Sequence, residues 1–177
     1  MEIEEIKKII VDQKEEIILT NPRRLSNEKQ GSAKQVLILR LKEFFKKKGS
    51  EYHIEMVFIY GSYASGYPRI DSDIDLGILF DAKIEDIDEI FSLITDITYE
   101  LDKELNKEVN IIPILRDFSR PMLYYNAIVL GTPVFVKNNN QLLSLKLEAI
   151  HQMEDFQLFG IPLQQHLAQK LLRSVML

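Results

Sequence analysis

The sequence predicts an α+β fold in which a small mixed β-sheet carries helices on one face. Segments with a helical period of apolar residues alternate with short runs of β-branched and aromatic residues, and the expected order of elements is α-α-β-β-α-β-α-β-α-α. The 177 residues, of which 46% are apolar and 28% charged, are enough for the core of one domain with small helical additions.

The first elements are expected to be two helices. Isoleucines with charged residues between them predict a helix over 2–19, which ends before Pro22 because proline disfavours helical backbone at the preceding residue. A second helix is expected from about Glu28 or Ser32 to Lys48. Its buried side would consist of the apolar residues Val36, Leu37, Leu41, Phe44 and Phe45.

The middle of the chain is expected to alternate strands with helices. Short apolar runs predict strands at Ile54–Tyr60, Ile74–Phe80, Glu108–Leu115 and Pro133–Val136. Apolar residues at three- and four-residue steps predict an amphipathic helix over 84–106. Another helix is expected over 119–130, with Gly131 as its C-cap.

The C-terminal residues predict two further helices, over Leu142–Phe159 and Leu163–Val175. We expect a break between them at Gly160-Ile161-Pro162, because a proline inside a helix removes a backbone hydrogen bond. Their apolar residues would belong to the core or to a protein interface.

The composition excludes several classes of protein. The chain has no cysteine, which excludes disulfides, cysteine-bound zinc and thiol nucleophiles. No apolar run approaches the ~20 residues of a membrane-spanning helix, and the first residues, Met1–Glu5, are acidic where a signal peptide would be basic. We therefore expect a cytoplasmic protein without a membrane segment.

The net charge of −5 is unevenly distributed. Residues 21–50 carry nine Lys or Arg against two acidic residues, which is +7 and leaves −12 for the rest of the chain. We interpret this basic segment as a solvated helix face beside an acidic body. Contact with a triphosphate, a nucleic acid or an acidic partner is the alternative.

Two carboxylates are placed where they can bind a metal ion. Asp73 and Asp75 lie two residues apart at the start of a predicted strand, so both point to one face while Ile74 points to the other. Two converging carboxylates repel each other unless a cation lies between them. Mg²⁺ fits such a site because it prefers oxygen ligands and leaves positions open for water or phosphate.

A candidate phosphate-binding turn precedes these carboxylates. Gly61 and Ser62 follow a predicted strand, where free backbone N–H groups and the Ser62 hydroxyl would suit a phosphate. Glycine removes the side chain that would block a close approach. Nucleotidyl transfer uses a phosphate-binding turn beside a metal site formed by two carboxylates.

These residues resemble the polymerase-β-type nucleotidyltransferases, and most closely their minimal nucleotidyltransferase (MNT) subgroup. The subgroup's signature is Gly-Ser, ten residues, then Asp-x-Asp. Here Gly61-Ser62, the ten residues Tyr63–Ser72 and Asp73-Ile74-Asp75 match it without a gap. The combination is far more specific than either short motif alone.

The resemblance covers roughly 36–136 and implies the organisation of the chain. We expect an N-terminal helical extension at 1–35, a nucleotidyltransferase domain at 36–137 and a C-terminal helical extension at 138–177. The family fold is the small mixed sheet with helices described above.

The resemblance also implies site residues and cofactors. Asp73 and Asp75 would bind two Mg²⁺ ions, and the nucleotide, ATP or another nucleoside triphosphate, would contact Gly61, Ser62, Ser65, Gly66, Arg69 and Ser72. The expected reaction moves AMP from ATP onto a hydroxyl group. In an MNT antitoxin, that hydroxyl would be a tyrosine of a HEPN-type toxin partner.

Two residues depart from the family pattern. Ser65 stands where the subgroup often has Arg, and Arg69 in the same loop could supply that charge. Asn110 stands where the third catalytic carboxylate is expected, and an amide cannot act as a general base. Glu108, two residues earlier, could substitute for it if the register slipped.

Two other functions stay open at this stage. A module that has lost catalysis could neutralise a toxin by contact alone, which Asn110 favours. A small-molecule nucleotidyltransferase of the aminoglycoside type is disfavoured, because the helices after residue 140 are short for its extra domain. A nucleic-acid template is not expected in a chain of 177 residues, and a homo-oligomer stays open.

Overall fold

The computed structural model describes residues 22–66, 68–69, 72–84 and 86–175. The predicted helix over 2–19 lies outside them. Contacts divide the chain into two units, Met1–Leu39 and Arg40–Leu177. The β-sheet and the candidate site residues all belong to the second unit.

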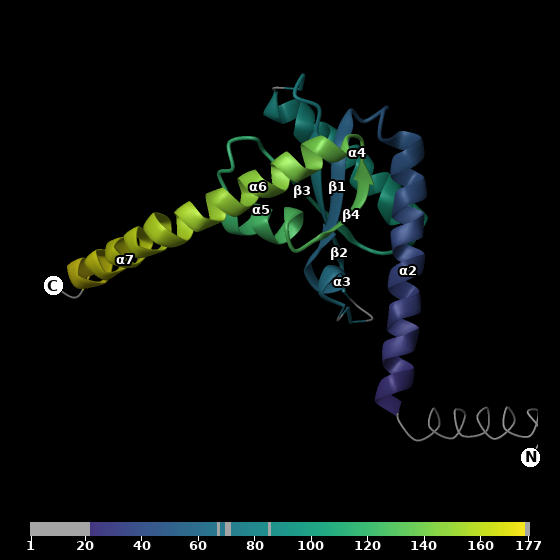
Figure 1. Cartoon of the computed structure of the whole chain (residues 1–177), viewed down its shortest axis with the longest axis horizontal. Helices are drawn as coiled ribbons and strands as arrows, with labels where there is room; N and C mark the ends of the chain where they lie inside the picture. The colour runs from purple at the N-terminus through teal and green to yellow at the C-terminus, as the bar shows by residue number, and fades with distance from the viewer. Residues whose placement is uncertain (1–21, 67, 70–71, 85, 176–177) are drawn as a thin grey trace, which may run out of the picture. The chain divides into compact units, whose positions relative to one another are not determined.

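Within the described residues, four strands form a single mixed sheet. They are β1 (Ile54–Tyr60), β2 (Ile74–Phe80), β3 (Val109–Pro113) and β4 (Thr132–Val136), in the order β3-β2-β1-β4 (Figure 1). The inner strand β1 is antiparallel to both β2 and β4, and the other inner strand, β2, is parallel to β3. The predicted α+β class with a small mixed sheet is confirmed.

Helices connect and cover these strands. They are α2 (Pro22–Lys48), α3 (Gly61–Ser65), α4 (Ile87–Leu105), α5 (Pro121–Ile128), α6 (Asn139–Asp155) and α7 (Ile161–Val175). α4 begins three residues later than predicted because the Asp86 side chain caps it by accepting a hydrogen bond from the Asp88 N–H.

α2 begins earlier than predicted, at Pro22 rather than at Glu28 or Ser32. Proline suits the first turn of a helix, because its fixed φ is helical and its missing N–H would have had no partner there. Four of the five residues predicted to be buried are buried: Leu37, Leu41, Phe44 and Phe45. Val36 is 50% exposed, so that part of the prediction is wrong.

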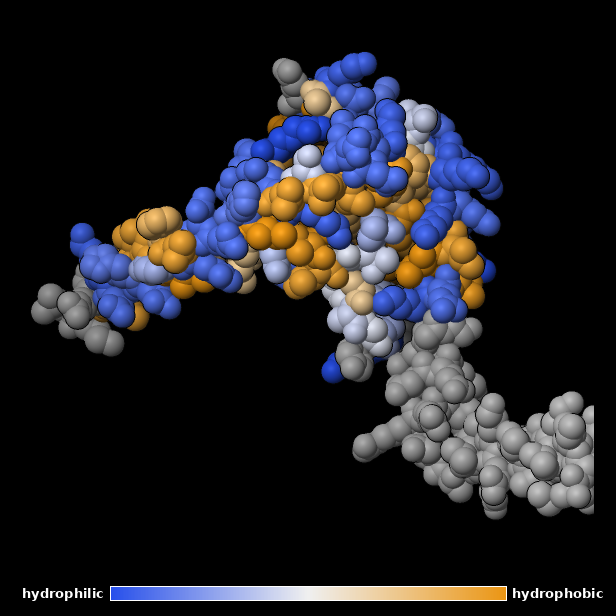
Figure 2. Space-filling model, viewed as in Figure 1, coloured by the Kyte–Doolittle hydropathy of each residue, from blue (hydrophilic) through white to orange (hydrophobic). Residues whose placement is uncertain are grey.

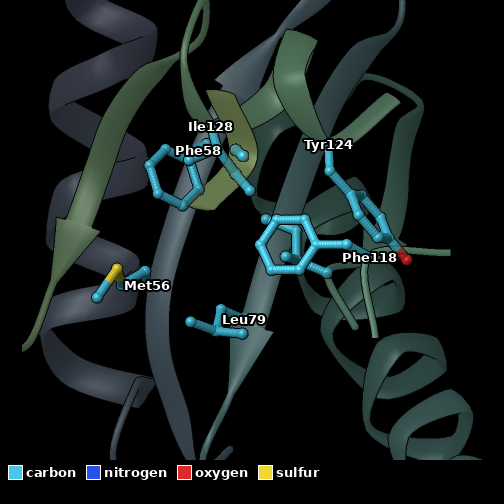
Figure 3. Packing of buried hydrophobic residues seen from close by; sticks show 8 residues of the cluster. Met56, Phe58, Leu79, Phe118, Tyr124 and Ile128 are labelled. Atoms are coloured by element: carbon cyan, nitrogen blue, oxygen red, sulfur yellow. The ribbon is translucent and has the colours of Figure 1, made fainter. Parts of the chain in front are cut away.

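One face of the sheet packs against α5 and α6. Met56 and Phe58 of β1 and Leu79 of β2 point to this face, where they meet Ile114, Phe118, Tyr124, Ile128 and Ala149 (Figure 3). The rings of Phe118 and Tyr124 pack edge to face at 5.9 Å. This cluster anchors the strands that carry the candidate site.

The opposite face is buried as well. Side chains alternate along a strand, so Val57, Ile59 and Ile78 point away from the α5 side, and all three are fully buried. α4 contacts β3, and its end is joined to the end of α2 by a 3.4 Å ion pair between Lys48 and Glu100. Burial is therefore not limited to one face of the sheet.

The sequence predicts Gly131 as the C-cap of the helix now seen as α5, and this prediction is wrong. α5 ends at Ile128, and the C-cap is Val129. A Cβ atom at position 131 would overlap the Ala127 carbonyl oxygen and would lie 2.9 Å from the Ile59 carbonyl oxygen. Glycine is needed here because two backbone segments approach this point closely.

The predicted break at Gly160-Ile161-Pro162 is wrong. α6 continues through one π-helical turn, η1 (Phe156–Gly160), directly into α7. A wider turn accommodates the proline, whose missing N–H then interrupts no regular α-helical bond. None of the helices in the described part of the chain has the length and hydropathy to cross a bilayer.

Candidate functional site

Three polar side chains stand in one row across the sheet. Asp75 near the start of β2 pairs with Tyr60 at the end of β1, and on its other side with Asn110 of β3. Paired residues of neighbouring strands point to the same face. Asp73 precedes β2 by one residue, and its carboxylate accepts a 3.3 Å hydrogen bond from the Asn110 amide.

Gly61 holds the turn after β1 directly against Asp75. Its φ is +68°, a conformation that other residues rarely adopt. A Cβ atom at this position would overlap the Asp75 carboxylate oxygen Oδ2. The sequence thus requires glycine for two reasons, and the predicted phosphate turn does lie beside the predicted metal ligand.

The environment makes negative charge costly at this point. Burial, with a contribution from the charge of Asp73, raises the pKa of the Asp75 carboxyl. Burial and the nearby Asp75 raise the pKa of Tyr60 to about 12, so this phenol is neutral at ordinary pH. Both shifts indicate a place where a cation would be favoured.

The donor set fits magnesium better than a soft metal. Asp73 and Asp75 supply carboxylate oxygens, and the Asn110 amide supplies a further oxygen if it rotates, all of which are hard ligands. Among the described residues, no group of three or more His, Cys, Asp or Glu side chains is suitably placed to hold a metal. Two carboxylate ligands leave positions on a bound metal for water or phosphate.

Asn110, and not Glu108, occupies the position next to the two aspartates. The register pairs Asn110 with Asp75, while Glu108 is exposed before β3 and accepts the Ile74 N–H with its backbone carbonyl. The register slip that would bring Glu108 opposite Asp75 is absent from this parallel pair.

The loop residues predicted to bind nucleotide are held by local hydrogen bonds. The Ser65 hydroxyl donates to the carbonyl oxygens of Gly61 and Ser62 at 3.0 and 3.2 Å. Gly66 ends α3 with a φ of +87°. Ser72 Oγ accepts the Arg69 N–H at 2.8 Å, which ties the two sides of the loop together.

Lys107 is a cation of this site that the sequence analysis missed. Its Nζ donates to the Ser72 carbonyl oxygen at 3.4 Å and lies 5.7 Å from the centre of the Tyr63 ring. It is 35 residues from Ser72 in sequence, and only the parallel pairing of β2 with β3 brings the two together. The sequence signal that could have identified Lys107 is its position as a basic residue just before the third predicted strand.

A separate cavity of about 460 Å³ lies at the other end of β2. Apolar residues such as Leu79, Ile90 and Ile114 line it, with Arg116 among its polar residues. None of the predicted site residues lines this cavity. The carboxylates define the candidate site by their chemistry, and this cavity is separate from it.

Comparison with known families places most of the chain in one family. Residues 40–140 match the family model of polymerase beta nucleotidyltransferases. No curated protein matches the sequence.

Several solved structures share the fold. A chain of a toxin–antitoxin crystal structure with AMP-PNP superposes with a TM-score of 0.50 and 17% identity, over 77% of this chain and 98% of that chain. A mutant form of the MntA–HpeT toxin–antitoxin superposes with the same TM-score and 15% identity, over 77% and 98% of the two chains.

Proposed function

This chain belongs to the polymerase beta nucleotidyltransferase family, and we propose that it binds ATP with Mg²⁺ and transfers AMP to a hydroxyl group of a partner protein. The observation that carries the proposal is the placement of Asp75 beside the Gly61 turn and in one row with Asn110, whose amide also donates to Asp73. Metal ligands and a phosphate-binding turn that touch each other are what nucleotidyl transfer requires.

The residues of the turn would bind the triphosphate. Gly61 leaves room for a close approach to the backbone, and Ser62 adds a hydroxyl donor. Lys107 beside Ser72 and Arg69 in the loop supply positive charge for the β- and γ-phosphates. The Ser65 hydroxyl, bonded to two backbone carbonyls, shapes the turn and leaves the phosphate contacts to its neighbours.

Asp73 and Asp75 would hold Mg²⁺ ions, with the Asn110 amide oxygen as an additional ligand. When bound, magnesium supplies charge for the developing negative charge on the α-phosphate and acidifies the attacking hydroxyl. The acceptor oxygen bonds to the α-phosphorus, pyrophosphate leaves, and the hydroxyl proton must pass to a base. The Asn110 amide cannot accept that proton, so we expect slow turnover.

The partner would be a toxin, by analogy with proteins of the same fold. The superposed structures are toxin–antitoxin complexes, one of them with the ATP analogue AMP-PNP. The MNT signature in this sequence points in the same direction. We propose a HEPN-type partner whose tyrosine hydroxyl receives the AMP.

A second candidate function is neutralisation by contact alone. The hydrogen bond from Asn110 to Asp73 favours it, because an amide that donates to a carboxylate can hold the pair in place without a metal ion. In that case the fold and the site geometry would persist as a binding module.

Calorimetric titration of the full chain with ATP tests the nucleotide site, with and without Mg²⁺. We expect Mg²⁺-dependent binding that weakens at least about tenfold in Asp73→Ala. Asp96→Ala is the matched control, since it removes an exposed carboxylate on α4, outside the site. If the folded wild-type chain fails to bind millimolar ATP, the enzymatic proposal is wrong and the contact module remains.

A further inference from the structure

One side of α2 carries two large apolar side chains that the domain does not cover. Val36 is 50% exposed and Leu39 is 60% exposed. The two residues are three positions apart, so they lie on the same side of the helix. At about 100° per residue, this side is turned away from the side that carries the buried Leu41 and Phe44. We call Val36 and Leu39 the exposed pair.

The exposed surface of α2 changes from apolar to charged directly after Leu39. Between residues 40 and 48, every apolar side chain is buried. The fully exposed residues of this stretch are all charged: Arg40, Lys42, Glu43, Lys46 and Lys47. Figure 2 shows orange surface on α2 beside the grey residues and blue surface towards the end of the helix. An element that covers the apolar part of this surface therefore has no reason to extend beyond Leu39.

Residues 2–19, which precede the described part of the chain, have the apolar pattern of an element that could cover the exposed pair. Their sequence predicts a helix with isoleucines along one side, at steps of three, four and seven residues: Ile3, Ile6, Ile10 and Ile17. An isolated helix of this length is marginally stable in water, so it needs a surface on which to bury that side.

The length of this segment matches the apolar part of α2. Only Thr20 and Asn21 separate residue 19 from the start of α2, a connection of the length that joins antiparallel helices. The 18 residues of the predicted helix span about 27 Å, and Leu39 lies about 26 Å along α2 from its first residue. An antiparallel return thus places Ile6 opposite Val36.

Charge favours this segment over a second copy of α2. Residues 2–19 contain six acidic residues against three lysines, a net charge of −3. Residues 22–39 contain four basic residues against Glu28, a net charge of +3. The segment and this part of α2 therefore attract each other, whereas two copies of α2 would set +3 against +3. Residues 1–21 and the exposed pair also belong to the same unit, Met1–Leu39.

We propose that the exposed pair is a docking site for residues 2–19 of the same chain, which fold back as a helix antiparallel to α2. Ile6 packs on Val36 and Ile3 packs on Leu39, and the charged part of α2 after Leu39 stays in contact with water. The two helices form an αα-hairpin. This inference does not depend on the proposed nucleotidyl transfer.

Disulfide cross-linking of the full chain tests the docking, because the chain has no native cysteine. We expect Ile6→Cys with Val36→Cys to cross-link within one chain under mild oxidation. The matched control is Lys8→Cys with Val36→Cys, in which the first cysteine is turned by about 200° about the helix axis. Since a disulfide requires close Cβ atoms, the control should cross-link at least about tenfold more slowly.

Amide hydrogen exchange of residues 2–19 gives a second measurement. The double change Val36→Gln with Leu39→Gln should accelerate exchange in this segment at least about tenfold, because it removes the apolar docking site. Glu43→Gln with Lys47→Gln is the matched control, since both residues are exposed on α2 beyond Leu39 and the net charge stays the same. Glutamine is a good helix former, so both variants should retain α2.

Each measurement has a result that would overturn the proposal. Cross-links that join two chains, and that disappear on dilution, would mean that the segment docks on a second copy. Equal cross-linking rates of the two cysteine pairs would exclude a defined packing side. Wild-type amides of residues 2–19 that exchange as fast as those of an unfolded chain would exclude docking. An equal effect of the control at Glu43 and Lys47 would exclude the exposed pair as the docking site.

Discussion

Asn110 lies beside Asp75 in the parallel pair and donates its amide hydrogen to Asp73. An aspartate at this position would have the same shape and nearly the same volume, but it would add a third negative charge and a group that can accept a proton. The site with asparagine therefore differs from one with aspartate by a single atom, an amide nitrogen in place of a carboxylate oxygen, and only the aspartate could accept a proton.

Asn110→Asp is expected to raise turnover. With water as acceptor, Mg²⁺-dependent release of pyrophosphate from ATP should increase about tenfold or more, because a positioned base typically contributes that much. Asn110→Ala serves as control, since it removes the hydrogen bond to Asp73 without adding a base. No increase with the aspartate would support the contact module.

The negative charge of Asp75 is expected to destabilise the folded protein when no metal ion is bound. Its folded pKa is raised by burial and by Asp73, so its charge destabilises the folded state at pH above that pKa, and the cost disappears as the pH falls below the unfolded pKa.

Asp75→Asn should therefore raise the Tm at pH 7.5, by about 1–3 °C for a partly exposed group, and by less near pH 4. Thermal melts in EDTA measure this difference. Addition of Mg²⁺ should raise the Tm of the wild type and leave that of the variant nearly unchanged. A variant less stable than the wild type at pH 7.5 would contradict the assignment.

At the scale of elements, strands were easier to predict than helix ends. β1 and β2 are bounded as expected, because each is a short, mainly apolar run with one acidic residue that stops at a glycine or a charged turn. The start of α4 depends on one Asp86 side chain, and the passage from α6 to α7 depends on a π-turn, for which the sequence carries no clear signal.

Some residues of the candidate site could likewise be predicted from the sequence, and others could not. Gly61, Asp73 and Asp75 are close in sequence, so a motif could predict them. Asn110 was expected at the site only through the family resemblance, and the place of Lys107 depends on the register between β2 and β3, which is set by tertiary packing. Sequence spacing carries no information of that kind.

Gly131→Ala is expected to destabilise the link between α5 and β4. The added methyl group would overlap the Ala127 carbonyl oxygen, and both backbones are held in place. We expect a loss of about 2–3 kcal/mol, or about 5–10 °C in Tm.

Gly66→Ala is the control for this prediction. Its φ of +87° strains alanine, but nothing lies within 4 Å of the new atom, so its loss should be nearer 1 kcal/mol. Equal Tm changes in the two variants would mean that backbone strain alone, and not crowding, explains both.

At the scale of the whole molecule, the predicted domain boundary at residue 36 can be tested by truncation. Removal of residues 1–35 keeps the buried residues Leu41, Phe44 and Phe45 of α2. We expect this shortened chain to melt cooperatively and to retain Mg²⁺-dependent ATP binding.

Removal of residues 1–48 takes these three side chains away. Since each large buried side chain contributes about 2–5 kcal/mol, this shorter chain should not fold cooperatively. Circular dichroism melts of both chains give the comparison. A folded chain without residues 1–48 would show that α2 is dispensable for the domain.

The π-turn η1 joins two stretches of α-helix by widening a single turn. Such a turn accommodates one more residue than an α-helical turn, so deleting one residue from Phe156–Gly160 would restore a regular helix and leave the later side chains facing nearly the same direction. The direction in which Leu163, Leu167 and Leu171 face should thus tolerate the loss of one residue at this point. Loss of one codon from the regular α-helical part of α6 would instead rotate these side chains by about 100° about the helix axis without altering any of them.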